Sequence, residues 1–142
     1  MENKTLLSRF EEYYPLSQLE DLIPNVRMAF KYMEDNPLNK ISLKDVAIFV
    51  GIEEELLCKE INRDLRKYKI DFTCVRYQEG LKLIEAKKLF LSDKKISCKE
   101  VAVRIKTGSR NLRKFTHKFT GLSPKEFKKK VWKDKIVPQM TK

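Results

Sequence analysis

The chain has 142 residues, with 31 Lys and Arg against 20 Asp and Glu, and its formal net charge is +11. This length fits one compact domain, or two small subdomains, with a real core. Only four glycines and five prolines are present, which leaves little room for a fold of many turns, so we expect an all-α protein. The longest apolar run, residues 46–50, is too short to span a bilayer. We therefore expect no membrane partner and a cytoplasmic location.

The positive charge is concentrated in the second part of the chain. Residues 1–60 contain seven Lys or Arg and twelve Asp or Glu, a balance of −5, whereas residues 61–142 contain 24 and eight, a balance of +16. A one-sided basic surface attracts polyanions and speeds encounter with them. Charge alone leaves nucleic acid and a merely solubilising lysine-rich surface equally open, with an acidic membrane a distant third.

In chain order, the spacing of apolar residues first predicts two helices. A short amphipathic helix is expected over residues 1–14 and ends at Pro15; a second is expected over residues 25–34, after Pro24. Residues 1–24 are too few to form a ligand pocket. Docking on the following subdomain, dimerisation and partner binding are open roles for them.

Nine residues then recur almost unchanged at an offset of 55. The segment KISLKDVAI, Lys40–Ile48, returns as KISCKEVAV, Lys95–Val103, with six identities. In each copy a serine precedes an acid by three positions, which is the pattern of a capped helix start. The sequence therefore predicts the same helical unit twice. A repeated helical reader with a basic second copy points toward nucleic acid.

Each copy continues through a turn into a second helix that has an apolar and a basic face. The first of these helices is expected over residues 53–68, with Leu57, Ile61, Leu65 and Tyr68 packed and with Lys59, Asn62, Arg63 and Arg66 outside. The second is expected over residues 109–119, with Leu112, Phe115 and Phe119 packed and with Arg110, Arg113, Lys114 and His117 outside. A long helix is expected over residues 72–91 as a connector between the two units.

A helix, a tight turn and a second helix with a cationic outer face form the layout of a helix-turn-helix, whose second helix enters the major groove. Guanidinium and ammonium groups donate to guanine O6 and N7 or to phosphate oxygens. Thr107 and Ser109, at the helix start, are suited to hold a phosphate together with free backbone amides. The plain alternative is a pair of helix hairpins that serve only as core.

From Asn25 to Trp132 the chain resembles the DNA-binding domain of the AraC/XylS-type bacterial transcription regulators. The segment FTHKFTGLSPKEFKKK, Phe115–Lys130, is similar to the family's C-terminal signature, and RYQEGLKLIEAKKLFL, Arg76–Leu91, is similar to its linker helix. The resemblance implies homeodomain-like helical units in two helix-turn-helix subdomains joined by a long linker helix. The expected organisation is an N-terminal extension (1–24), a first subdomain (25–71), a linker helix (72–92), a second subdomain (93–135) and a tail (136–142).

The resemblance implies a double-stranded DNA reader whose two recognition helices enter neighbouring stretches of the major groove. The chain looks like the short stand-alone members, which have no effector domain and contact RNA polymerase; its oligomeric state is open. By alignment the base-reading positions fall on Ser109, Arg110, Arg113 and Lys114 in the second unit and on Glu55, Cys58 and Lys59 in the first. The predicted DNA site comprises Lys106, Thr107, Ser109, Arg110, Arg113, Lys114, His117, Lys118 and Lys125, with Lys59, Asn62 and Arg63 as secondary contacts.

The first unit departs from the family pattern. Glu53, Glu54 and Glu55 place three negative charges where a recognition helix should meet phosphates. The segment after Ile61 is about five residues longer than in the family, and Lys106 stands where the second turn usually has glycine. We expect the second unit to supply most base contact. The alternative function is a protein-interaction adaptor or antagonist that uses the acidic first unit to bind a partner.

The sequence gives little support for catalysis, metal binding or a cofactor. His117 is the only histidine and has no nucleophilic partner visible in the sequence, so we do not expect an enzyme. Cys58, Cys74 and Cys98 match no zinc spacing and are expected to be free thiols in a reducing compartment. The lysine-rich stretch around Trp132 is expected to be a solvated helix, with phosphate or acidic membrane contact as alternatives.

Overall fold

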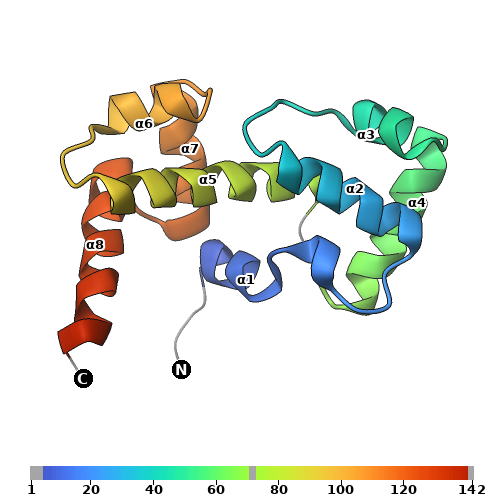
Figure 1. The fold of residues 1–142 in the computed structure, drawn as a ribbon, viewed down its shortest axis with the longest axis horizontal. Helices are drawn as coiled ribbons and strands as arrows, with labels where there is room; N and C mark the ends of the chain where they lie inside the picture. The colour runs from blue at the N-terminus through green and yellow to red at the C-terminus, as the bar shows by residue number, and fades with distance from the viewer. Residues whose placement is uncertain (1–4, 71–72, 141–142) are drawn as a thin grey trace. The chain divides into compact units, whose positions relative to one another are not determined.

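A computed structural model of the chain describes residues 5–70 and 73–140. Within these residues every regular element is helical and no strand is present, which confirms the all-α prediction (Figure 1). The elements are α1 (Leu6–Tyr13), the 3-10 helix η1 (Leu16–Gln18), α2 (Pro24–Asp35), α3 (Leu43–Val50), α4 (Glu54–Lys67), α5 (Cys74–Ser92), α6 (Cys98–Arg104), α7 (Ser109–Thr120) and α8 (Pro124–Met140).

The helices expected from the sequence are present, with ends that differ from the expected ones by at most two residues for α2, α4, α5 and α7. Helix α1 begins at Leu6. The first four residues of the predicted N-terminal extension, positions 71–72 at the predicted subdomain boundary and the last two residues of the predicted tail lie outside the described residues.

The chain divides into two compact units. The N-terminal unit is Arg9–Gln78, and the C-terminal unit contains the described residues of Glu79–Lys142 and of Met1–Ser8. One boundary falls inside α1, between Ser8 and Arg9, and the other inside α5, which contributes its first turn to the N-terminal unit and the remainder to the C-terminal unit.

In the N-terminal unit, α2, α3 and α4 contact one another pairwise around a core that includes Phe30, Met33, Leu57 and Ile61. Helix α2 begins without a side-chain cap, because Ile23 occupies the capping position. The buried Asp64 of α4 binds the capping residue itself, since its Oδ2 accepts the Ile23 amide hydrogen at 2.8 Å. A carboxylate from a neighbouring helix thus serves the orphan amide at the start of α2.

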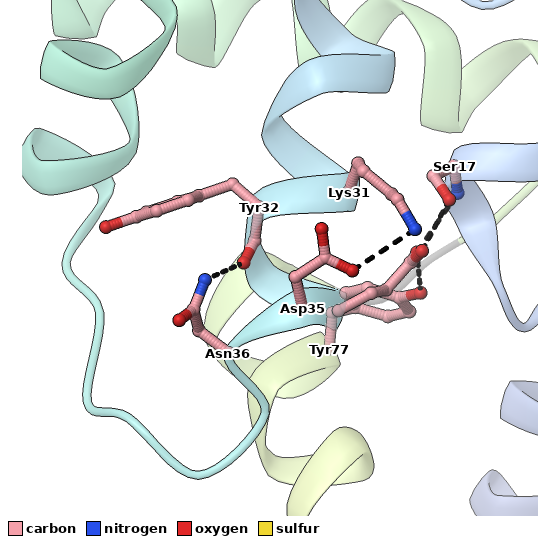
Figure 2. A network of polar contacts seen from close by, with 7 residues as sticks. Ser17, Lys31, Tyr32, Asp35, Asn36 and Tyr77 are labelled. Carbon is pink, nitrogen blue, oxygen red and sulfur yellow. Dashed lines mark hydrogen bonds and ion pairs between the residues drawn. The ribbon is translucent and has the colours of Figure 1, made fainter.

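A buried polar network ties the residues before α2 to the same unit (Figure 2). Tyr77 donates its hydroxyl to Glu34 Oε2 at 2.5 Å and accepts the Leu16 amide hydrogen at 3.0 Å. Ser17 donates both its amide and its hydroxyl to the Glu34 carboxylate. Burial is the largest cause that raises the pKa of Tyr77, and the bond to Glu34 raises it further. Residues from the predicted N-terminal extension therefore take part in the core of this unit.

In the C-terminal unit, α8 is fixed to the end of α5. The indole Nε1 of Trp132 donates to the Phe90 carbonyl at 2.7 Å, and the rings of Phe90 and Phe127 lie edge to face with centroids 6.2 Å apart. Lys128 donates its Nζ to the Ile96 carbonyl at 2.5 Å. Two members of the lysine-rich segment expected to be simply solvated therefore make bonds within the fold.

Candidate nucleic-acid interface

The offset of 55 residues also relates the helix starts of the structure, beyond the nine repeated residues. Helices α3 and α6 start at Leu43 and Cys98, and α4 and α7 start at Glu54 and Ser109, each pair 55 residues apart. Both predicted caps are confirmed. Ser42 accepts the Asp45 amide hydrogen at 3.1 Å, and Ser97 accepts that of Glu100 at 3.1 Å.

The turns that follow α3 and α6 share a residue with positive φ at the equivalent position. Gly51 has a φ of 88° and Lys106, at the equivalent position, has a φ of 57°. The next amide closes the turn in both copies, from Ile52 to the Ala47 carbonyl at 3.2 Å and from Thr107 to the Ala102 carbonyl at 2.9 Å. Lys106 thus adopts the left-handed conformation that glycine usually provides at a helix C-terminus.

Helix α7 separates an apolar from a cationic face, as the sequence predicts. Leu112, Phe115 and Phe119 are buried, and so is Thr116, which was not expected in the core. The opposite face exposes Arg110, Arg113, Lys114 and His117. Among the described residues, none of these four side chains pairs with an acid.

The N-terminus of α7 leaves backbone donors available. Gly108 occupies its capping position and provides no side-chain acceptor. The first amides of a helix have no partner within the helix, and the helix dipole places positive potential there. Thr107 is half-buried and Lys106 and Ser109 are exposed around this end. Positive charge and free amide donors therefore coincide at one end of the cationic face.

A cavity of about 310 Å³ brings residues of three helices together in the C-terminal unit. Its lining includes Ser109 and Arg113 of α7, Lys125 of α8 and Cys98 of α6. The predicted Ser109, Arg113 and Lys125 thus lie around one hollow. Cys98 was not predicted to line it, because a cysteine within a repeat copy gives no signal of what faces it across the fold.

Lys118 differs from the other predicted cations. Its Nζ lies 3.4 Å from Glu79 Oε2 on α5, so an acid within the same unit already pairs with it. The ion pair is partly exposed and contributes little to stability, in the range of about 0–1 kcal/mol. Lys118 would have to leave this pair, or share its charge, in order to neutralise a phosphate.

The equivalent face of α4 in the N-terminal unit is chemically different. Lys59, Asn62 and Arg63 are exposed, at the positions that correspond to Lys114, His117 and Lys118. Lys59 lies 4.0 Å from Glu55, and Asn62 donates to the Cys58 sulfur at 3.6 Å. The first turn, however, contains exposed glutamates where α7 has Ser109 and Arg110. The two copies share a backbone but not a surface charge.

The cysteines are free thiols, and all three are partly buried. Burial raises the pKa of Cys74 to about 11, so its thiolate is scarce at neutral pH. No three His, Cys, Asp or Glu side chains of the described residues gather in a group able to hold a metal ion. In the same part of the chain, no helix combines the length and the apolar character that a membrane crossing requires.

Comparison with known proteins gives no relative. No family model, no curated protein and no solved structure matches the chain.

Proposed function

We propose that this chain is a sequence-specific, double-stranded DNA-binding transcription regulator. On this proposal α2–α4 and α6–α8 are two helix-turn-helix subdomains, α5 is the linker helix, and α7 enters the major groove. The observation that carries the proposal is the exposed set of Arg110, Arg113, Lys114 and His117, which lies on one face of a helix whose other face is buried. None of the four is paired with an acid among the described residues.

The chemistry of this face suits a duplex. Arg110 and Arg113 each carry a planar fork of donors that matches guanine O6 and N7, while Lys114 provides a point charge for a base edge or a phosphate. The uncapped amides after Gly108 and the ammonium group of Lys125 favour a backbone phosphate near the start of α7. Base contacts then determine sequence preference, and phosphate contacts determine position on the duplex.

The charge of each unit supports a main role in DNA binding for the C-terminal unit. Residues 79–142 with residues 1–8 hold 20 Lys or Arg and seven Asp or Glu, whereas residues 9–78 hold 11 and 13. Because like charges repel, the exposed glutamates at the start of α4 oppose a phosphate there. The resemblance to the AraC/XylS-type regulators adds a bacterial cytoplasmic setting and contact with RNA polymerase.

The test uses two lysines at equivalent positions. We expect Lys114→Ala to weaken binding of the intact chain to duplex DNA, in fluorescence anisotropy at physiological salt, far more than the matched Lys59→Ala. Arg110→Ala should cost about 1–3 kcal/mol and relax the preference at one base pair. Lys125→Ala should weaken all duplexes alike and reduce the slope of log K against log salt by about one. Equal losses in the two lysine variants would contradict the assignment to α7.

A further inference from the structure

The N-terminal unit exposes large apolar side chains on the outer sides of its helices. Ile48 and Phe49 of α3 are 70% and 53% exposed, Leu56 of α4 is 47% exposed, and Met28 of α2 is also exposed. We call these four residues, together with Tyr32 of α2, the Phe49 face. Single exposed apolar residues are ordinary, but several on three contacting helices need an explanation.

The two aromatic residues of this face stack on each other. The rings of Tyr32 and Phe49 are stacked, with centroids 4.2 Å apart and planes inclined by 13°. Figure 2 shows the Tyr32 ring extending away from the Ser17 and Tyr77 network. Met28 lies one turn before Tyr32, on the same side of α2. The stack therefore presents two aromatic side chains that have already lost much of their rotational freedom, and this lowers the entropy cost of binding.

The second copy shows which of these exposed residues are peculiar to the N-terminal unit. Ile48 corresponds to Val103, which is 68% exposed, so both copies expose an apolar residue there. Phe49, in contrast, corresponds to Arg104, whose guanidinium pairs with Glu100 at 3.0 Å. Leu56 corresponds to Asn111.

The charges next to Leu56 of the Phe49 face also differ between the two copies. Glu53, Glu54 and Glu55, all exposed, occupy the positions of Gly108, Ser109 and Arg110. The first copy thus replaces polar and basic side chains with apolar and acidic ones while it keeps the backbone. This difference opposes contact with a polyanion at the surface and favours a partner with apolar and positively charged groups.

We propose that the Phe49 face is a docking surface for a basic amphipathic helix of a protein partner. Apolar residues at helical spacing on the partner pack against the Tyr32 and Phe49 rings, and its flanking Lys or Arg side chains meet Glu53–Glu55. Tyrosine is among the residues enriched at the energetic centres of protein interfaces, and recognition of an amphipathic helix through its apolar face is a recurring mode of binding. This inference concerns α2, α3 and α4 and does not depend on the proposed DNA contact of α7.

The probe is a fluorescent helical peptide of 18 leucine and lysine residues, with leucine at helical spacing. Its controls are the same composition in scrambled order and an all-lysine peptide. We expect the intact chain to bind the amphipathic peptide and neither control. Phe49→Ser and Leu56→Asn should each weaken that binding about tenfold, which corresponds to about 1.4 kcal/mol. Val103→Ser removes a side chain of similar exposure from the other unit and should leave binding unchanged.

Circular dichroism of each variant shows whether it remains folded, and because the substituted side chains are exposed we expect full helicity. Equal binding of the scrambled peptide, or equal loss in Phe49→Ser and Val103→Ser, would overturn the proposal. A dimer in sedimentation that Phe49→Ser dissociates would also overturn it, because the occupant would then be a second copy of the chain. Duplex DNA binding is measured in parallel, and Phe49→Ser should leave it unchanged.

Discussion

The left-handed turn after α3 permits a stability prediction with a defined sign. Gly51 has a φ of 88°, and a Cβ added there would meet no heavy atom within 4 Å. Gly51→Ala therefore introduces backbone strain without a clash. The left-handed conformation costs a residue with a side chain about 1–2 kcal/mol, while the reduced freedom of the unfolded chain returns about 0.4–1 kcal/mol. We expect the free energy of unfolding to fall by about 1 kcal/mol.

At the equivalent turn of the second copy, the reverse kind of substitution should raise the free energy of unfolding. Lys106 has a φ of 57°, so Lys106→Gly relieves the strain at a smaller entropic cost, and we expect a gain of about 0.5–1 kcal/mol. Urea unfolding measures both changes, and hydrogen exchange at the amides of Ile52 and Thr107 locates each in its own turn. Stabilisation by Gly51→Ala, which is the ordinary result at a glycine with negative φ, would refute this reasoning, as would a loss in Lys106→Gly.

Substitutions at three further positions test the buried and capping interactions. Asp64→Ala leaves the Ile23 amide without its acceptor and should lower the free energy of unfolding by about 1–3 kcal/mol. Asp64→Asn keeps an acceptor oxygen and should cause a smaller loss. Equal urea midpoints for the two variants would contradict this role of Asp64. At the start of α8 the Ser123 amide donates to Glu126 Oε1 at 3.1 Å, and this bond, with a smaller contribution from the Ser123 hydroxyl, lowers the pKa of Glu126. Ser123→Ala removes the hydroxyl and keeps the amide, so in an NMR titration the pKa of Glu126 should rise only part of the way toward its ordinary value. Because the pKa of Glu126 is depressed in the folded chain, the bond between its charged carboxylate and the Ser123 amide stabilises the fold above the ordinary glutamate pKa, and this contribution is lost as the pH falls through the lowered value. A free energy of unfolding that does not fall over this pH range would argue against the role of Glu126. Burial raises the pKa of Tyr77, so an alkaline absorbance titration should leave one tyrosine un-ionised in the folded chain. The free energy of unfolding should decline as the pH rises above the ordinary tyrosine pKa. A Tyr77→Phe variant that still contains a tyrosine resistant to ionisation would exclude the assignment to Tyr77.

Local features of the fold could be predicted from the sequence because their causes lie within a few residues. Ser42 and Ser97 cap their helices through an amide three positions later, and Gly51 ends α3 through its own conformational freedom. Apolar spacing likewise identified the buried side of α7, including Leu112 and Phe115. In each case the pattern and the bond that it predicts belong to one turn of helix.

Features that join distant segments could not be predicted in this way. The pairing of Lys118 with Glu79 depends on how α5 and α7 pack within the C-terminal unit, and so does the cavity that Cys98 lines with residues of α7 and α8. The stack of Phe49 on Tyr32 joins two helices, and neither aromatic residue has a periodic pattern that distinguishes an exposed face from a core. A sequence indicates which residues can interact, while packing determines which ones meet.

Selection of bound duplexes from random DNA, with the intact chain at physiological salt, tests the central proposal most directly. We predict an enriched motif that Lys59→Ala preserves, and from which Arg113→Ala removes the preference at one base pair. Recovery of no sequence above competitor DNA, or an unchanged motif in Arg113→Ala, would contradict the proposal that the exposed face of α7 reads the major groove.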